Sequence, residues 1–148
     1  MGARKPVGEV TGADMATTYD TNVFGVVRVT HAFLPLLEAR DAPVVVNVGS
    51  GLGSRAATSD PSRVEFHVTA LDYNSSKTAL VMITAQYAKA FPAIRFNAVD
   101  PGYTATDLNG HTGTQTIEEG TEIIVSMASI DSDGPTGGFF DRTGPVVW

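Results

Sequence analysis

The sequence predicts an α/β fold in which helices and strands alternate and the strands form a parallel sheet. Two short apolar runs, residues 44–48 and 94–99, are rich in β-branched or aromatic residues and each is followed by a glycine-containing turn. Apolar residues recur at helical spacing in residues 11–40 and 73–91, and a third helix start lies at Thr116. This order of helix, strand, helix, strand and helix is typical of a parallel sheet joined by right-handed crossovers.

The first half of the chain contains the first expected helix and strand. The helix, residues 11–40, begins with Thr11 followed three residues later by Asp14, a pairing typical of helix N-termini. Its apolar positions follow a 3.6-residue period, which indicates an amphipathic helix. After Pro43, the continuous apolar run 44–48 predicts a strand that is buried on both faces.

The second half repeats the alternation. Residues 73–91 predict a helix, which a proline ends, and residues 94–99 predict a second strand. Thr116 and Glu119 have the spacing of a capping box at the start of the third helix. A last short strand is expected from residues 139–142, after a glycine-rich loop.

Composition bounds the classes of function. The 148 residues have the size of one domain, so we expect a single domain over residues 1–148. The net charge of −6 opposes attraction to nucleic acid or to anionic membranes, and neither is expected as a partner. Without cysteine there is no disulfide or thiolate, and the three separated histidines predict no metal site. No apolar signal or membrane-spanning run is present, which fits a cytoplasmic protein.

Candidate catalytic residues lie where the first strand ends and where the next helix begins. Ser50 follows the strand, and the carboxyl ends of parallel strands are where ligands bind. Tyr73 and Lys77 are four residues apart, so they share one face of the helix. A nearby ammonium lowers the pKa of a phenol from about 10 towards neutral pH, as general acid/base catalysis requires. Taken alone, this spacing is also common on solvated helix faces.

Four ordered motifs place this pair in a wider pattern. They are Asn22-Val23-Phe24-Gly25, Asn47-Val48-Gly49-Ser50, Tyr73-Asn74-Ser75-Ser76-Lys77 and Asp100-Pro101-Gly102-Tyr103-Thr104-Ala105-Thr106. In this order the chain resembles the short-chain dehydrogenase/reductase family, in its carbonyl-reductase-like branch, over essentially its whole length. The resemblance implies the C-terminal part of a Rossmann-like, doubly wound parallel sheet.

The resemblance also implies a catalytic role for four residues. Tyr73 would protonate the carbonyl oxygen in reduction and deprotonate the alcohol in the reverse reaction. Lys77 would lower the pKa of the phenol and hydrogen-bond the nicotinamide ribose. Ser50 would donate a hydrogen bond to the substrate oxygen, and Asn22 would hold a water in the proton relay. Read without the resemblance, Ser50 ends a strand and Asn22 is a local hydrogen-bonding residue that bends its helix.

The implied cofactor is NADP or NAD, with NADP favoured, and the implied substrate is a small carbonyl or alcohol compound. Besides Tyr73 and Lys77, the residues expected near the cofactor are Pro101 and Gly102 beside the nicotinamide. Thr104 and Thr106 would help to hold the nicotinamide end and the phosphates, or are ordinary loop residues.

Two departures from the family pattern matter. The separation of Ser50 and Tyr73 is long, so residues 54–72 would lie at the mouth of the site, as part of the substrate pocket or as a disordered surface insertion. The glycine-rich cofactor turn, the first three strands and the Asn-Asn-Ala-Gly motif have no counterpart in this sequence. The main pyrophosphate site is therefore expected to be absent, and the isolated chain to be inactive.

Three functions stay open at this point. The first is a NAD(P)-dependent oxidoreductase. The second is a non-catalytic relative that forms homo-oligomers or pairs with a full-length relative, since the two long helices commonly form the subunit interface in this family. An open edge on the strand at residues 44–48 would also favour association. The third, a nucleotide-sugar epimerase, normally needs a large C-terminal substrate domain.

Overall fold

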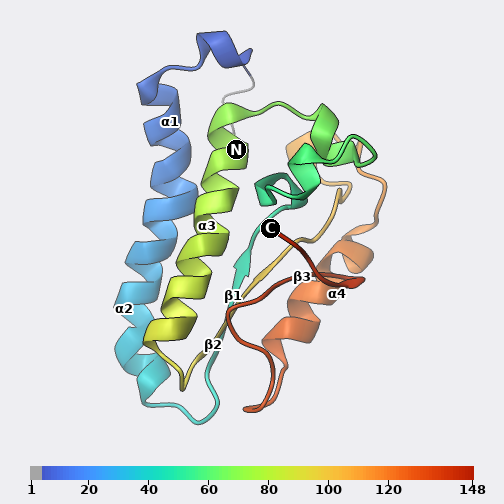
Figure 1. Cartoon of the computed structure of the whole chain (residues 1–148). Coiled ribbons are helices and arrows are strands. Elements are labelled where there is room, and N and C mark those ends of the chain that lie inside the picture. The colour runs from blue at the N-terminus through green and yellow to red at the C-terminus, as the bar shows by residue number, and fades with distance from the viewer. Residues whose placement is uncertain (1–4) are drawn as a thin grey trace.

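A four-stranded sheet with the order β1-β2-β3-β4 lies at the centre of the fold (Figure 1). β1 (Val44–Val48), β2 (Arg95–Val99) and β3 (Phe139–Asp141) are parallel, and β4 (Gly144–Pro145) returns antiparallel to β3. The computed structural model describes residues 5–148, except for the side chain of Leu108. The predicted α/β class with a parallel sheet is confirmed, and the β4 hairpin is an addition that the sequence pattern did not indicate.

The first predicted helix is continuous but changes its winding in the middle. α1 (Gly12–Tyr19) begins after Thr11, whose hydroxyl accepts a hydrogen bond from the Asp14 N–H at 3.3 Å while Asp14 accepts from the Thr11 N–H at 2.9 Å. The predicted capping box is therefore confirmed. The segment η2 (Asp20–Gly25) is π-helical, and α2 (Val26–Glu38) completes the rod. π-Helical turns are rare and frequently lie at functional sites.

Helices cover both faces of the sheet. α3 (Leu71–Ala90) lies against one face beside α1 and α2, and α4 (Ile117–Ala128) lies on the other face (Figure 1). Phe96 of β2 is fully buried, and its ring stacks on Tyr87 of α3 with the centroids 5.3 Å apart. Such stacking adds to the gain from burial and holds α3 on the sheet. Among residues 5–148, no helix is long and apolar enough to cross a membrane.

The boundaries of the helices are close to those predicted. α3 begins at Leu71, two residues earlier than expected, and ends at Ala90. α4 begins after Thr116, which forms the predicted capping box with Glu119 at N···O distances of 2.9 and 3.2 Å. The segment before α3 contains two 3-10 turns, Ala57–Ser59 and η5 (Val64–His67), and its part in a substrate pocket stays a prediction.

β1 is an edge strand of the described sheet, as the open edge expected for residues 44–48 requires. Its faces are less covered than the apolar run predicted, so the expectation that both are buried was wrong. Val44, Val45 and Val46 are half-buried and Val48 is 41% exposed. Burial depends on the neighbours of a strand as well as on its own residues, and β2 is the one strand that pairs with β1 in the described part of the chain.

The free edge of β1 can be located from its hydrogen bonds to β2. The Arg95 N–H donates to the Pro43 carbonyl at 2.9 Å, and the Gly49 N–H donates to the Val99 carbonyl at 2.6 Å. In a parallel ladder, the backbone N–H and C=O groups of alternate residues point to the same side. Those of Val44 and Val46 therefore point away from β2. These unpaired groups are a template for another strand.

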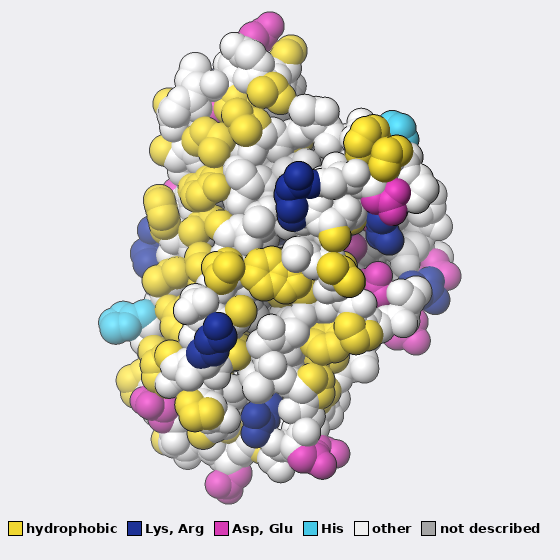
Figure 2. Space-filling view, viewed as in Figure 1, with side chains coloured by type: hydrophobic (Ala, Val, Ile, Leu, Met, Phe, Trp, Pro, Cys, Tyr) yellow, Lys and Arg dark blue, Asp and Glu magenta, His cyan; other side chains and the backbone are white. Residues whose placement is uncertain are grey.

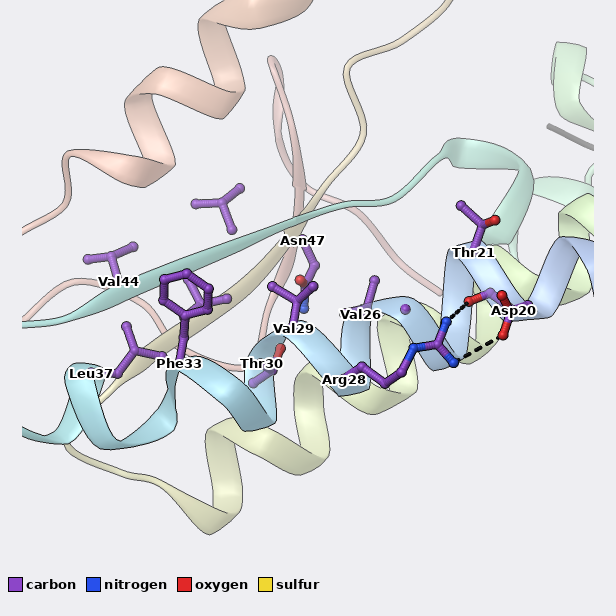
Figure 3. A pocket seen from close by; sticks show the side chains of 13 residues that line it. Asp20, Thr21, Val26, Arg28, Val29, Thr30, Phe33, Leu37, Val44 and Asn47 are labelled. Carbon is purple, nitrogen blue, oxygen red and sulfur yellow. Dashed lines mark hydrogen bonds and ion pairs between the residues drawn. The ribbon is translucent and has the colours of Figure 1, made fainter.

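Apolar surface lies next to this free edge. Figure 2 shows hydrophobic side chains gathered along the α1–α2 side of the molecule. Between α2 and β1 there is a hollow of about 710 Å³, into which Phe33 and Val29 project (Figure 3). The ion pair between Arg28 and Asp20, 3.0 Å apart, lies at one end of it. The face around the edge is therefore suited to a further apolar segment.

Candidate active site

The predicted site residues meet where β1 and β2 end. Val48 pairs with Val99 at the last position of the parallel ladder, and Gly49 continues the pairing by one residue. The loops that follow both strands consequently leave the same edge of the sheet, which is where parallel sheets bind ligands. Ser50 follows β1, and Asp100 follows β2.

The loop that carries Ser50 rests directly on α3. Ser50 has an extended backbone and is followed by the 3-10 turn η3 (Gly51–Gly53). The Gly53 carbonyl accepts a hydrogen bond from the Thr78 hydroxyl at 2.8 Å. A Cβ atom on Gly53 would lie 2.7 Å from the backbone carbonyl carbon of Lys77, closer than a Cβ atom can approach. Glycine at this position therefore allows the contact that brings Ser50 to the first turns of α3.

Tyr73 is half-buried in the first turn of α3, and its phenol faces the Ser50 hydroxyl. Burial raises the pKa of the phenol, the Ser50 hydroxyl lowers it in part, and the charge of Asp100 raises it further. The net direction is upward, so the phenol keeps its proton at neutral pH. The sequence-based expectation of a lowered pKa was wrong, because desolvation is the largest influence on this group.

Lys77 lies on the same face of α3 as Tyr73, as the spacing predicted. Its Nζ is 5.6 Å from the centroid of the Tyr73 ring and donates a hydrogen bond to the Val48 carbonyl at 2.8 Å. That carbonyl is on the free edge of β1. Burial lowers the pKa of the ammonium, and the negative charge of Asp100 raises it in part. Lys77 thus connects α3 to the end of β1.

Asn22 is joined to the Tyr73 turn through a buried serine. The Asn22 Nδ2 donates to the Ser76 Oγ at 3.0 Å, and the Ser76 hydroxyl donates to the Tyr73 carbonyl at 2.7 Å. Asn22 comes from the π-helical segment η2, where the altered winding re-aims its side chain. The role of Asn22 in a water relay stays a prediction.

A second polar contact between the two long helices was missed by sequence reasoning. Asp72, which is 2% exposed, accepts a hydrogen bond from the Thr18 hydroxyl at 2.6 Å. Ser76 lies inside the Tyr-Lys motif and had no predicted role. Asp72 and Ser76 are four residues apart and so share one face of the helix, which is the signal that could have identified them as contacts to the first helix.

The Pro101–Gly102 turn and the threonines after it form a structured loop. Gly102 has a φ of +72°, a conformation that favours glycine, and its N–H donates to the Asp100 Oδ1 at 3.0 Å. The Thr104 hydroxyl donates to the Pro101 carbonyl at 3.2 Å. Thr106 caps a 3-10 turn through Asn109. Both threonines therefore have structural partners, and their contacts to a cofactor stay a prediction.

Comparisons with known proteins agree with this arrangement. Residues 1–117 match the family described as short chain dehydrogenase. The (+)-neomenthol dehydrogenase of Capsicum annuum is 31% identical over 171 residues, covering 91% of this chain and 54% of the relative. Salutaridine reductase of Papaver bracteatum is 31% identical over 153 residues, covering 81% of this chain and 49% of the relative. The chain belongs to the short-chain dehydrogenase/reductase family.

Solved structures show the same fold. The carbonyl reductase Sniffer of D. melanogaster has a TM-score of 0.82 at 21% identity, over 100% of this chain and 63% of that chain. An NADPH-bound carbonyl reductase from chicken fatty liver has a TM-score of 0.83 at 22% identity, over 100% of this chain and 62% of that chain. The fold is therefore carbonyl-reductase-like and Rossmann-like. The chain spans about half the length of the curated relatives it matches.

The contact between the Ser50 loop and α3 predicts a specific sensitivity. We expect Gly53→Ala to lower the free energy of unfolding by about 1–3 kcal/mol, because the added methyl group meets the Lys77 backbone. Gly12→Ala is the matched control, since a Cβ at Gly12 meets nothing within 4 Å. Urea denaturation of the three proteins measures the difference. Equal stability of the Gly53→Ala and Gly12→Ala variants would contradict the close packing of this loop.

Proposed function

We propose that this chain carries the catalytic residues of an NAD(P)-dependent oxidoreductase that transfers hydride between a nicotinamide cofactor and a small carbonyl or alcohol compound. NADP is the favoured cofactor, and the cytoplasm is the proposed location. The observation that carries the proposal is the meeting of Ser50, Tyr73 and Lys77 at the carboxyl edge of the sheet, with the Lys77 Nζ 5.6 Å from the centroid of the Tyr73 ring and bonded to the end of β1. Family membership supports the class of reaction.

The residues at this edge fit the nicotinamide end of such a cofactor. The Lys77 ammonium has three N–H donors. One of them donates to the Val48 carbonyl, and the other two remain for ribose hydroxyls. Gly102 has a φ of +72°, and the Gln115 side chain packs where a Cβ would stand, so this turn is held in one shape beside the proposed nicotinamide position. Bound there, the cofactor would supply the hydride. Thr104 and Thr106 are the proposed contacts towards the phosphates.

Tyr73 and Ser50 would provide the proton and the hydrogen bond at the substrate oxygen. Since the pKa of Tyr73 lies above its usual value, the phenol is a proton donor at neutral pH and serves carbonyl reduction. The Ser50 hydroxyl would stabilise the negative charge that develops on the oxygen. Alcohol oxidation needs the phenolate. The rate of alcohol oxidation should therefore increase as the pH rises towards the pKa of Tyr73.

We expect Tyr73→Phe to reduce the rate of carbonyl reduction by about 10²- to 10⁴-fold, because the proton donor is lost and the ring is kept. The rate is measured as NADPH oxidation in the full-length context, with the cofactor-binding segment that the relatives carry. Tyr87→Phe on the same helix is the control, since Tyr87 packs in the core against Phe96. Activity of Tyr73→Phe within about tenfold of the parent would refute the assignment.

A second candidate is a non-catalytic partner that associates with a further copy or with a full-length relative. The free edge of β1 and the apolar hollow beside α2 favour it.

On either proposal, the 148-residue chain by itself should bind a dinucleotide weakly. In residues 5–148, the glycine-rich turn after β1 leads into short 3-10 turns and not directly into an α-helix whose N-terminus would hold the pyrophosphate.

We therefore expect the 148-residue chain to bind NADPH in the millimolar range or not at all, which corresponds to about 4 kcal/mol or less. A fluorescence titration with NADPH and NADH measures this, and a full-length relative is the positive control. Saturable binding in the micromolar range would overturn this expectation and would favour the oxidoreductase without a further segment.

A further inference from the structure

Asp100 contacts both loops of the candidate site. Its backbone N–H donates to the Phe140 carbonyl of β3 at 2.7 Å, which fixes the residue at the sheet edge. The Oδ1 of its carboxylate accepts the Gly102 N–H at 3.0 Å. The carboxylate also packs against the backbone of Gly51, the residue after Ser50, since a Cβ atom there would lie 2.7 Å from its Oδ2. One side chain thus contacts the loop after β1 and receives a peptide N–H from the loop after β2.

The carboxylates of Asp100 and Glu65 both pack closely against Gly51. A Cβ atom on Gly51 would lie 2.7 Å from the Asp100 Oδ2 and 2.8 Å from the Glu65 Oε1. A larger residue would therefore displace the ends of these two side chains, and glycine lets both carboxylates approach the loop. A carboxylate accepts two N–H groups without presenting a donor, whereas an asparagine amide would direct its own N–H₂ at one of them.

Charged and titratable groups face Asp100 from three further elements. Tyr73 and Lys77 face it from α3, Asp141 from β3, and Glu65 from η5. Glu65 is itself paired with Arg63 at 3.1 Å. Burial and the like charges of Asp141 and Glu65 raise the pKa of Asp100, and the peptides of Gly102 and Gly51 oppose this rise. The ionised carboxylate in turn raises the pKa values of Tyr73 and Lys77.

We infer that Asp100 is a positioning residue of this site: its carboxylate clamps the Ser50 loop to the Pro101–Gly102 turn and holds a negative charge beside Tyr73 and Lys77. The inference rests on the proposed function for its catalytic meaning. Asp100 acts through its neighbours and not on the substrate, since its carboxylate is held by the Gly102 peptide and packs against Gly51 of the other loop.

The clamp has a pH dependence whose sign follows from these contacts. Hydrogen bonds from peptide N–H groups favour the ionised carboxylate. Protonation of Asp100 therefore weakens its hydrogen bond from Gly102 and its attraction to the Gly51 peptide together. Because its pKa is raised, this change occurs at a higher pH than for an ordinary aspartate. Above that pH the two loops are held and the charge beside Tyr73 is present.

The test is an acid titration of the backbone amides in ¹H–¹⁵N NMR spectra of the 148-residue chain. The amide protons of Gly51 and Gly102 should move together with one midpoint above 3.8, the ordinary pKa of aspartate. Asp100→Asn should abolish both movements. Asp141→Asn is the matched control: it removes a neighbouring negative charge and should keep both movements while lowering their common midpoint.

A second measurement separates positioning from a merely structural contact. The pKa of the Tyr73 phenol, followed through its labelled ζ carbon, should fall in Asp100→Asn because a nearby negative charge is removed. An unchanged Tyr73 pKa, or a titration of Gly102 without Gly51, would overturn the inference. Neither measurement needs a cofactor or an active enzyme. The role of Asp100 can therefore be tested even if the proposed function is wrong. The parent titration also decides the matter if Asp100→Asn does not fold.

Discussion

The site depends on the parallel pairing of β1 with β2. Because Val48 lies opposite Val99, the two strands end at the same level, and the loops after them leave the sheet side by side. Two segments that are about fifty residues apart in sequence thereby become neighbours. A slip of the register by one residue would turn Asn47 away from Thr84 of α3 and would move Ser50 away from Tyr73.

Helix α3 adds the reactive groups to this edge, and burial then sets their chemistry. Tyr73 keeps its proton because its surroundings disfavour the phenolate. Lys77 reaches past the phenol to the Val48 carbonyl, a group that faces the free side of β1. Hydrogen bonds thus join the Ser50 loop to α3, and α3 to the end of β1.

Much of the fold could be predicted from local signals. The capping boxes at Thr11 and Thr116 depend on residues three positions apart, and both are present in the structure. The motif order also placed Ser50, Tyr73 and Lys77 at one sheet edge. The burial of β1 could not be predicted, because it is decided by neighbours distant in sequence. The π-helical winding around Asn22 was missed since apolar periodicity does not separate it from an α-helix over six residues. The direction of the Tyr73 pKa was missed because helical spacing reveals a charged neighbour but not desolvation.

The most direct test of this account is a double-mutant cycle between Ser50→Ala and Tyr73→Phe, measured as free energies of unfolding of the 148-residue chain. We expect the two changes not to be additive, with a coupling of about 0.5–1.5 kcal/mol, because each removes one of two hydroxyls that face each other in a partly buried site. Effects that add within about 0.3 kcal/mol would contradict it, since residues without contact behave in that way.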